Sequence, residues 1–175
     1  MPLVLANLEF EEGTQNMGGT SGLIYAIPAR DVLEITPPVS GTLTTSTVNF
    51  KTGKKCSTIY YTADTGEVKD VEVGEKDCGS FEVNMEAWTP RISDALLTLK
   101  SMLANGAYIF FMKDGNGVMR IIGSKDHPAY RTPGEIATGK APKDKNGALL
   151  KFQAASPTPA LIYSGDEEAL VTPGA

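Results

Sequence analysis

The sequence is poor in the residues that most often do chemistry or hold metals. It has one histidine, His127, and two cysteines, Cys56 and Cys78. These three residues cannot complete a four-ligand zinc site without carboxylates, so we expect no metal and no cofactor. The chain also has no Gly-x-Ser-x-Gly nucleophile for His127 to serve as a base, and we assign no catalytic residue. We therefore do not expect an enzyme.

The chain also lacks an apolar run of about 18 residues, the length that a membrane-spanning helix needs. Residues 1–5 are too short for a signal peptide, so we expect no secretion signal and a cytoplasmic start. Without secretion, the two cysteines are expected to be free thiols, and a disulfide between them is the alternative.

Basic residues are fewer than acidic ones: the chain has 16 Lys and Arg and 21 Asp and Glu, which gives a formal net charge of −5. Gripping duplex nucleic acid needs a Lys/Arg excess that neutralises phosphates, so specific nucleic-acid binding is not expected. The charges are also segregated, since acids dominate residues 64–86 and bases dominate residues 113–151. These segments are either two solvated faces or complementary surfaces that meet when copies assemble head to tail.

The 175 residues are 41% hydrophobic, and Gly and Pro separate many short apolar runs. This pattern favours one β-rich domain over residues 1–165. Residues 39–55 are rich in Thr and Ser with little to pack a core, and they are a candidate extended arm. The acidic residues 166–175 are expected to form a mobile tail.

Three segments give the clearest local signals. Residues 81–87 alternate apolar and polar side chains, which predicts a half-buried strand. An apolar stripe at helical spacing, from Ile92 to Leu103, predicts one helix over residues 91–104. Residues 107–112 and 118–122 are apolar runs around a Gly-rich turn, which predicts a central hairpin. The order of elements suits an antiparallel β-sandwich or partly open barrel flanked by one α-helix, with long polar loops.

Several local patterns are compatible with chemistry but have simpler interpretations. Residues 134–141 match G-x-x-x-x-G-K, but Ala141 replaces the Ser or Thr of a P-loop, so we read a plain loop. Residues 114–117 are read as a turn rather than a calcium loop. Glu82 and Glu86 share one face of a strand, either as a carboxylate pair or as solvated residues. Trp88 with the Tyr60–Tyr61 pair is either a sugar-stacking platform or core and interface packing.

Three stretches together carry a family resemblance. They are the helix near 91–104, the hairpin AYIFFMKDGNGVMRIIG followed by the loop and strand TPGEIATGKAPKDKNGALLKFQA, and the ending SPTPALIYSG. Over residues 81–165 the chain resembles phage tail-tube (major tail) proteins. The resemblance implies a helix-flanked sandwich or barrel, six copies in a ring, and rings stacked into a hollow virion tube. Residues 39–55 would then be a candidate inter-ring arm, and an acidic lumen would keep passing DNA from sticking.

The leading hypothesis is therefore a self-assembling structural protein of a phage or prophage tail or a tail-like particle. Its partners would be copies of itself and other tail proteins, and it would be assembled into virions in the host cytoplasm. The alternatives are a β-sandwich module that binds a carbohydrate or a peptide and, third, a hydrolase on a β scaffold. The candidate assembly surfaces are Val39, Thr44, Thr47, Phe50, Glu82, Glu86, Lys140, Lys143 and Lys145.

Overall fold

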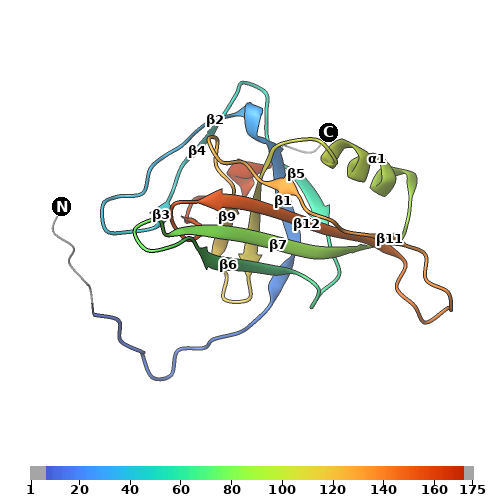
Figure 1. Ribbon diagram of the computed structural model, residues 1–175, viewed down its shortest axis with the longest axis horizontal. Helices are drawn as coiled ribbons and strands as arrows, with labels where there is room; N and C mark the ends of the chain where they lie inside the picture. Colours follow the sequence, from blue (N-terminus) through green and yellow to red (C-terminus); the bar gives the residue numbers. More distant parts are fainter. Residues whose placement is uncertain (1–6, 172–175) are drawn as a thin grey trace.

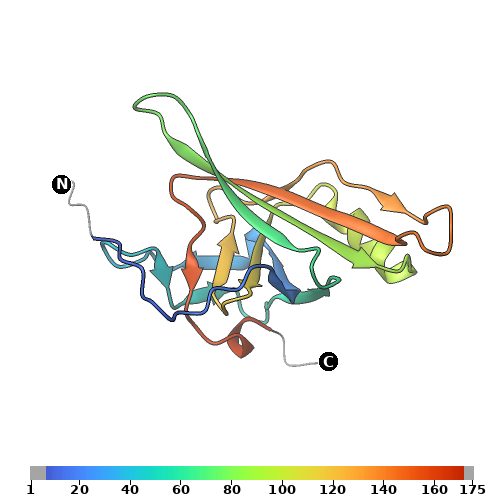
Figure 2. The ribbon, with the colours of Figure 1, turned by 90° about the horizontal axis from the view of Figure 1, so that it is seen from below.

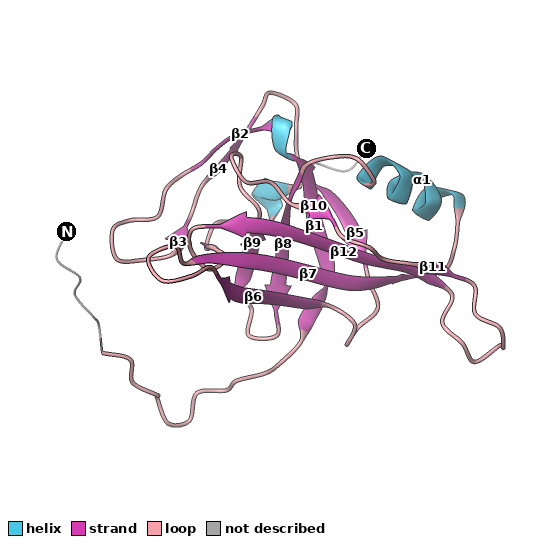
Figure 3. Cartoon of the chain, viewed as in Figure 1, coloured by secondary structure: helices cyan, strands magenta, loops and turns pink. Residues whose placement is uncertain are grey.

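Two β-sheets packed crosswise form the body of the protein, and one helix lies beside them (Figure 1). The structure is a computed structural model that describes residues 7–171. Figure 2 shows the two sheets as separate layers, and Figure 3 shows how strands and loops dominate the chain. The predicted mainly β sandwich with one helix is confirmed, and over residues 7–171 the sheets do not close into a barrel.

The first layer, sheet A, has six strands in the spatial order β3-β13-β9-β8-β1-β5. All neighbours in it are antiparallel except β13 and β3, which run parallel. The predicted hairpin is β8–β9, at the centre of this sheet. The strands of sheet A are β1 (Thr20–Pro28), β3 (Thr44–Thr45), β5 (Ser57–Tyr60), β8 (Tyr108–Asp114), β9 (Met119–Ile122) and β13 (Ile162–Tyr163).

The second layer, sheet B, has the spatial order β10-β12-β7-β6. The short strand β11 also pairs with β12. Its long strands β7 and β12 pair over ten residues, and β6 is the open edge. A separate ribbon, β2 (Val32–Ile35) with β4 (Val48–Phe50), lies against the body. The strands of sheet B are β6 (Glu67–Val73), β7 (Ser80–Pro90), β10 (Tyr130–Arg131), β11 (Ile136–Ala137) and β12 (Gly147–Ser156).

Strand β8 is buried on both of its faces, which explains its unbroken apolar sequence. Phe110 and Met112 point toward sheet B, where they pack with Phe152 in the core between the sheets. Ile109 and Phe111 point to the other face of sheet A, into a second apolar cluster. Because side chains alternate along a strand, only a strand covered on both sides needs apolar residues at every position. The second cover comes from the β2–β4 ribbon and the C-terminal segment.

The helix α1 (Asp94–Leu103) begins where the sequence indicates. The Ser93 hydroxyl accepts a hydrogen bond from the amide of Leu96 at 3.2 Å, which caps the first turn. Leu96 and Leu103 are buried, and Leu103 packs into the core between the sheets with Leu99 at its border. The helix lies at one end of the sandwich rather than across a sheet face (Figure 1), so only its C-terminal half contributes to the main core.

Residues 39–55 do not form a free arm in this structure. Thr44 and Thr45 pair with β13 at the edge of sheet A, and Thr45 is buried with 2% of its surface exposed. Phe50 belongs to β4 and borders the second apolar cluster. The segment is folded onto the body because its few apolar residues help to cover the outer face of β8. Because the segment is rich in Thr and has few apolar residues, its composition did not indicate that it covers β8.

The C-terminal segment is also docked as far as the structure describes it. A short 3-10 turn, Glu168–Leu170, inserts a fully buried Leu170 into the second cluster. Glu167 forms an ion pair with Lys113 of β8 and accepts a hydrogen bond from the Tyr25 hydroxyl at 3.1 Å. Residues 166–171, part of the segment expected to form a mobile tail, are thus in contact with the body, and residues 172–175 lie outside the described part.

Substituting Leu103 with alanine should lower the free energy of unfolding by about 2–5 kcal/mol, because it removes a buried side chain from the core. Leu97 is the matched control on the same helix, since 44% of its surface is exposed. Leu97→Ala should cost less than about 0.5 kcal/mol. Urea unfolding followed by circular dichroism measures both. Equal losses would show that the helix presents a different face to the core.

Docking of the C-terminal segment should weaken in acid. The hydrogen bond from Lys113 lowers the pKa of Glu167, with a smaller lowering from Tyr25 and an opposing effect of burial. A depressed pKa in the folded state adds stability above the unfolded pKa of about 4.3, and this stability is lost as the pH falls through the folded value. Because Glu167 is partly exposed, we expect a contribution of at most about 1 kcal/mol.

Urea midpoints at pH 6 and pH 3.5 test this linkage in the wild type and in Glu167→Gln. The variant should be less stable at pH 6 and should lose less stability than the wild type on acidification. The same loss in both proteins would exclude a role for the Glu167 ion pair.

Candidate functional site

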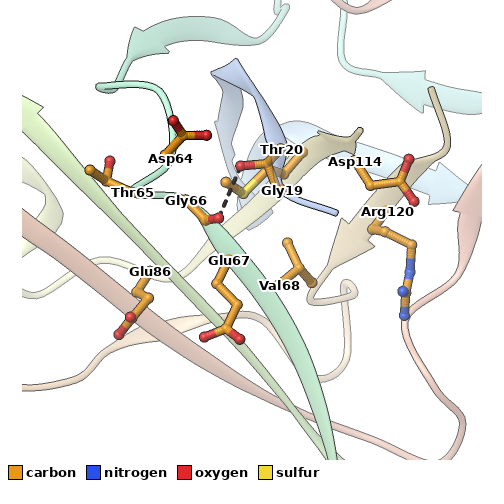
Figure 4. Close-up of a pocket in the computed structure, with 11 residues that line it drawn as sticks. Gly19, Thr20, Asp64, Thr65, Gly66, Glu67, Val68, Glu86, Asp114 and Arg120 are labelled. Atoms are coloured by element: carbon orange, nitrogen blue, oxygen red, sulfur yellow. Dashed lines mark hydrogen bonds between the residues drawn. The ribbon is translucent and has the colours of Figure 1, made fainter. Parts of the chain in front are cut away.

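A polar depression opens at the end of the sandwich where β1 and β6 begin and the β8–β9 turn closes (Figure 4). Its volume is about 540 Å³. The hydroxyl of Thr20 on β1 donates a hydrogen bond to the carbonyl of Gly66 at 3.1 Å, which ties the two layers together at its inner wall. Its lining residues are Gly19, Thr20, Asp64, Thr65, Gly66, Glu67, Val68, Glu86, Met112, Asp114 and Arg120.

Four carboxylates line this depression, but they do not converge on one point. Glu67 and Glu86 are directly opposed on β6 and β7, and in Figure 4 their side chains extend away from Asp64. Asp114 is committed to the turn, since its Oδ1 accepts the amides of Asn116 at 2.9 Å and Val118 at 2.8 Å. Within residues 7–171 no three His, Cys, Asp or Glu side chains are placed to hold a metal ion. The depression is an acidic surface that repels anions.

Arg120 crosses from sheet A to sheet B at the same depression. Its guanidinium forms an ion pair with Asp70 of β6, and the same carboxylate oxygen accepts the amide of Ala160 at 3.1 Å. Both partners are largely covered, with 26% and 17% of their side chains exposed. The other carboxylate oxygen of Asp70 and the Nε of Arg120 are buried without a partner. This pair joins β9 to β6 and to the segment before β13.

Gly66 is required at the inner wall for close packing. A β-carbon at this position would lie 2.4 Å from the Thr20 hydroxyl oxygen and 2.4 Å from the Tyr61 ring. Tyr61 is fully buried, its hydroxyl has no hydrogen-bond partner in the described chain, and burial raises its pKa. Its phenol is thus a structural group rather than an accessible acid.

The structure distributes the nine predicted assembly residues over three separate places. The first four lie around sheet A's outer edge and the β2–β4 ribbon: Val39 is 77% exposed, Thr44 is in β3, and Phe50 is in β4. The Thr47 carbonyl accepts the amide of Thr36 at 3.1 Å. Phe50 is partly covered by Lys55, whose Nζ lies 5.3 Å from its ring centroid.

Glu82 and Glu86 lie on the outer face of sheet B, where every second side chain of β7 points away from the core. Glu86 pairs with Lys151 of β12 at 3.3 Å. Lys140, Lys143 and Lys145 lie in the exposed loop between β11 and β12, at the opposite end of the molecule from the β2–β4 ribbon (Figure 1).

The aromatic platform considered for sugar stacking is not assembled. Tyr60 and Tyr61 are neighbours in sequence, and their exposures of 60% and 0% show that only Tyr60 reaches the surface. Trp88 has 8% of its surface exposed and is covered by Lys145, whose Nζ lies 5.9 Å from the Trp88 ring centroid. These aromatic residues therefore do not form a common exposed face.

The remaining reactive residues and motifs are placed separately. Cys56 and Cys78 are both free, and burial raises the pKa of Cys56 to about 12, which suppresses its thiolate. His127 is exposed in a turn in which the Ser124 hydroxyl accepts its amide. In the G-x-x-x-x-G-K segment, Asp144 accepts the amides of Lys140 at 2.9 Å and Ala141 at 2.8 Å. Those two amides are therefore engaged by a carboxylate of the chain itself.

Two features were missed in the sequence. Asp70 and Arg120 are fifty positions apart, and no local pattern announces their pairing. Residues 8–11 read Leu-Glu-Phe-Glu, an apolar–polar alternation typical of a strand, yet they pair with nothing here, and Leu8 and Phe10 are 99% and 79% exposed. This alternation is the sequence signal that marks the segment as a candidate unpaired strand.

Comparison of the chain with protein-family models, with curated proteins and with solved structures gives no match. Over the described residues, the structure has no helix with the length and apolar character needed to span a bilayer.

Arg120→Met should lower the free energy of unfolding by about 1–3 kcal/mol, because it leaves the largely covered Asp70 carboxylate without its cation. The matched control is Lys151→Met, which removes an equally charged partner from a more exposed carboxylate, Glu86. It should cost at most about 1 kcal/mol. Urea unfolding at pH 7 compares the two. A smaller loss for Arg120→Met than for Lys151→Met would contradict the importance of the cross-layer pair.

Proposed function

We propose that this protein is a structural subunit that associates head to tail with copies of itself. By resemblance, the copies form rings of six that stack into the tube of a phage tail or tail-like particle. The proposal gives the chain no catalytic role. Its partners are other copies of the chain and neighbouring tail proteins, and its place is in the assembled particle.

The observation that carries the proposal is the placement of opposite charge at the two edges of sheet B. The edge strand β6 and the turn after it carry an excess of acids, with Glu67, Glu72 and Glu75 exposed. The opposite edge carries Arg131 on β10 and the lysines of the β11–β12 loop. Figure 1 shows the β6–β7 turn and the β11–β12 loop at opposite ends of the molecule.

This placement favours a heterologous contact, in which the acidic edge of one copy meets the basic edge of the next. Such contacts generate rings when the rotation closes and filaments when it does not. The backbone supports the same arrangement, because β6 has a free edge along seven residues that a neighbouring strand can extend. Opposite charge would set the register of that contact.

Complementary charge reversal tests the proposal directly. One variant, Lys140→Glu/Lys143→Glu, makes both edges acidic, and another, Glu72→Lys/Glu75→Lys, makes both basic. Each alone should raise the concentration needed for assembly at least about tenfold, because like charges across an interface cost several kcal/mol. An equimolar mixture should assemble again. Native mass spectrometry and electron microscopy measure the outcome.

The control is Lys51→Glu/Lys54→Glu, which makes the same change of charge at two exposed lysines in the turn before β5. It should leave assembly within about twofold of the wild type. Wild-type assembly should also weaken as salt is raised, since a Debye length of about 8 Å at 0.15 M screens the contact. A wild-type chain that stays monomeric at high concentration, or a mixture that does not recover, would refute the proposal.

A peptide-binding module is the second candidate function, and one observation favours it. An apolar groove opens beside the edge strand β5, with a volume of about 760 Å³. A chain that remains monomeric in the experiment above and still captures extended peptides would favour this candidate.

A further inference from the structure

The groove beside β5 is built from sheet A and the C-terminal half of α1. Its floor is formed by the inner faces of β1 and β5, where Ala26 and Ile59 are buried. One wall is the helix, which contributes Leu99, Leu103 and the 67% exposed Met102. The lining is largely apolar, so the groove leaves hydrophobic surface open to water on a single chain.

The groove is open along the outer edge of β5. In the described chain only the start of this edge is occupied, since Cys56, just before β5, donates its amide to the Leu170 carbonyl at 2.7 Å and forms a parallel bridge with Val171. β5 is the last strand of sheet A, and it pairs only with β1. The amide of Tyr61 donates to the Gly22 carbonyl of β1 at 3.1 Å. Because amides alternate in direction along an antiparallel strand, those of Thr58 and Tyr60 point to the free side.

The N-terminal segment, residues 7–15, has the complementary character. Leu8 and Phe10 are two positions apart, so in an extended strand they point to the same side, while Glu9 and Glu11 point to the other. All residues of this segment are exposed, and it extends away from the body (Figure 1).

Within one copy, the segment can reach the near end of the groove but is too short to run along its whole length. Asn16 and Met17 are fastened to Asn116 in the β8–β9 turn by hydrogen bonds of 3.0 Å and 2.7 Å. From Asn16, an extended chain brings Phe10 at most about 20 Å. Ile59, at the near end of the groove, pairs with Ile24, about 13 Å along β1 from Thr20, whereas the Pro28 end lies about 27 Å from Thr20.

We infer that residues 7–12 of one copy add as a strand to the free edge of β5 in a second copy and place Leu8 and Phe10 in its groove. Strand addition supplies main-chain hydrogen bonds, and pockets for alternate side chains supply specificity. The inference rests on the proposed self-assembly, for which it names a second contact distinct from the charged edges of sheet B. In this contact, Leu8 and Phe10 fill the groove, and the N-terminal segment pairs with β5 of the second copy.

A fluorescent peptide with residues 1–15 of this chain tests the inference apart from assembly. The receptor is the full-length chain with Leu8→Ser/Phe10→Ser, whose own segment can no longer compete. Fluorescence anisotropy should show saturable binding of the wild-type peptide. A peptide with Leu8→Ser/Phe10→Ser should bind at least about tenfold more weakly, and the matched control peptide with Asn7→Ser/Thr14→Ser should bind within about twofold of the wild type.

Two receptor variants locate the site. Thr58→Pro removes an outward amide of the edge strand, where proline is tolerated because that amide bonds no strand within residues 7–171. Met102→Glu places a charge on the exposed groove wall without disturbing the core. Either change should weaken the peptide at least about tenfold, and circular dichroism confirms that the receptors remain folded.

The outcomes separate this inference from the proposed function. Peptide binding that depends on Leu8, Phe10 and the groove supports the inference even if the chain forms no rings. Rings that form normally while the peptide does not bind, or binds equally to all receptors, would overturn the inference and leave the proposed function standing.

Discussion

The fold depends on one constraint, the need to cover β8 on both sides. Four consecutive residues of this strand, Ile109 to Met112, are fully buried. A strand of this kind is stable only when apolar material lies above and below its sheet. Sheet B supplies one cover, and the β2–β4 ribbon with the C-terminal turn supplies the other. Two segments that look dispensable by composition therefore contribute to this cover, through Val48 and Phe50 at its border and through the buried Leu170.

Covering β8 in this way leaves the outer edges of both sheets without a paired strand in the described chain. Sheet A ends in the open strand β5, sheet B ends in the open strand β6, and the helix covers only part of one end. Open edges are an association hazard that proteins usually block. Here one edge is flanked by acidic charge and the other by an apolar groove. Specific association with copies of the chain gives both edges a physical role, and it is the basis of the function and the contact proposed above.

The polar depression shows why an acidic cluster is weak evidence for chemistry. Its carboxylates are divided among a turn, two opposed strand positions and a loop, and they do not converge. Its most informative residues are Asp70 and Arg120, which join the two layers. The same division applies to the predicted assembly residues, which occupy three places rather than one surface. Glu82 and the loop lysines belong to sheet B, whereas Thr44 and Phe50 help to complete the body.

The sequence by itself determined the local elements, because each was encoded by its own periodicity and end signals. Alternation over residues 81–87 gave β7, the leucine spacing with Ser93 gave α1, and the Gly-rich turn gave the β8–β9 hairpin. Only the tertiary structure decided what covers the outer face of β8, which charges pair across the layers, and where the open edges lie. Those outcomes depend on contacts between residues fifty to more than one hundred positions apart, such as Asp70 with Arg120 and Tyr25 with Glu167. No local pattern encodes such contacts, because their energy appears only when the whole chain has closed around β8.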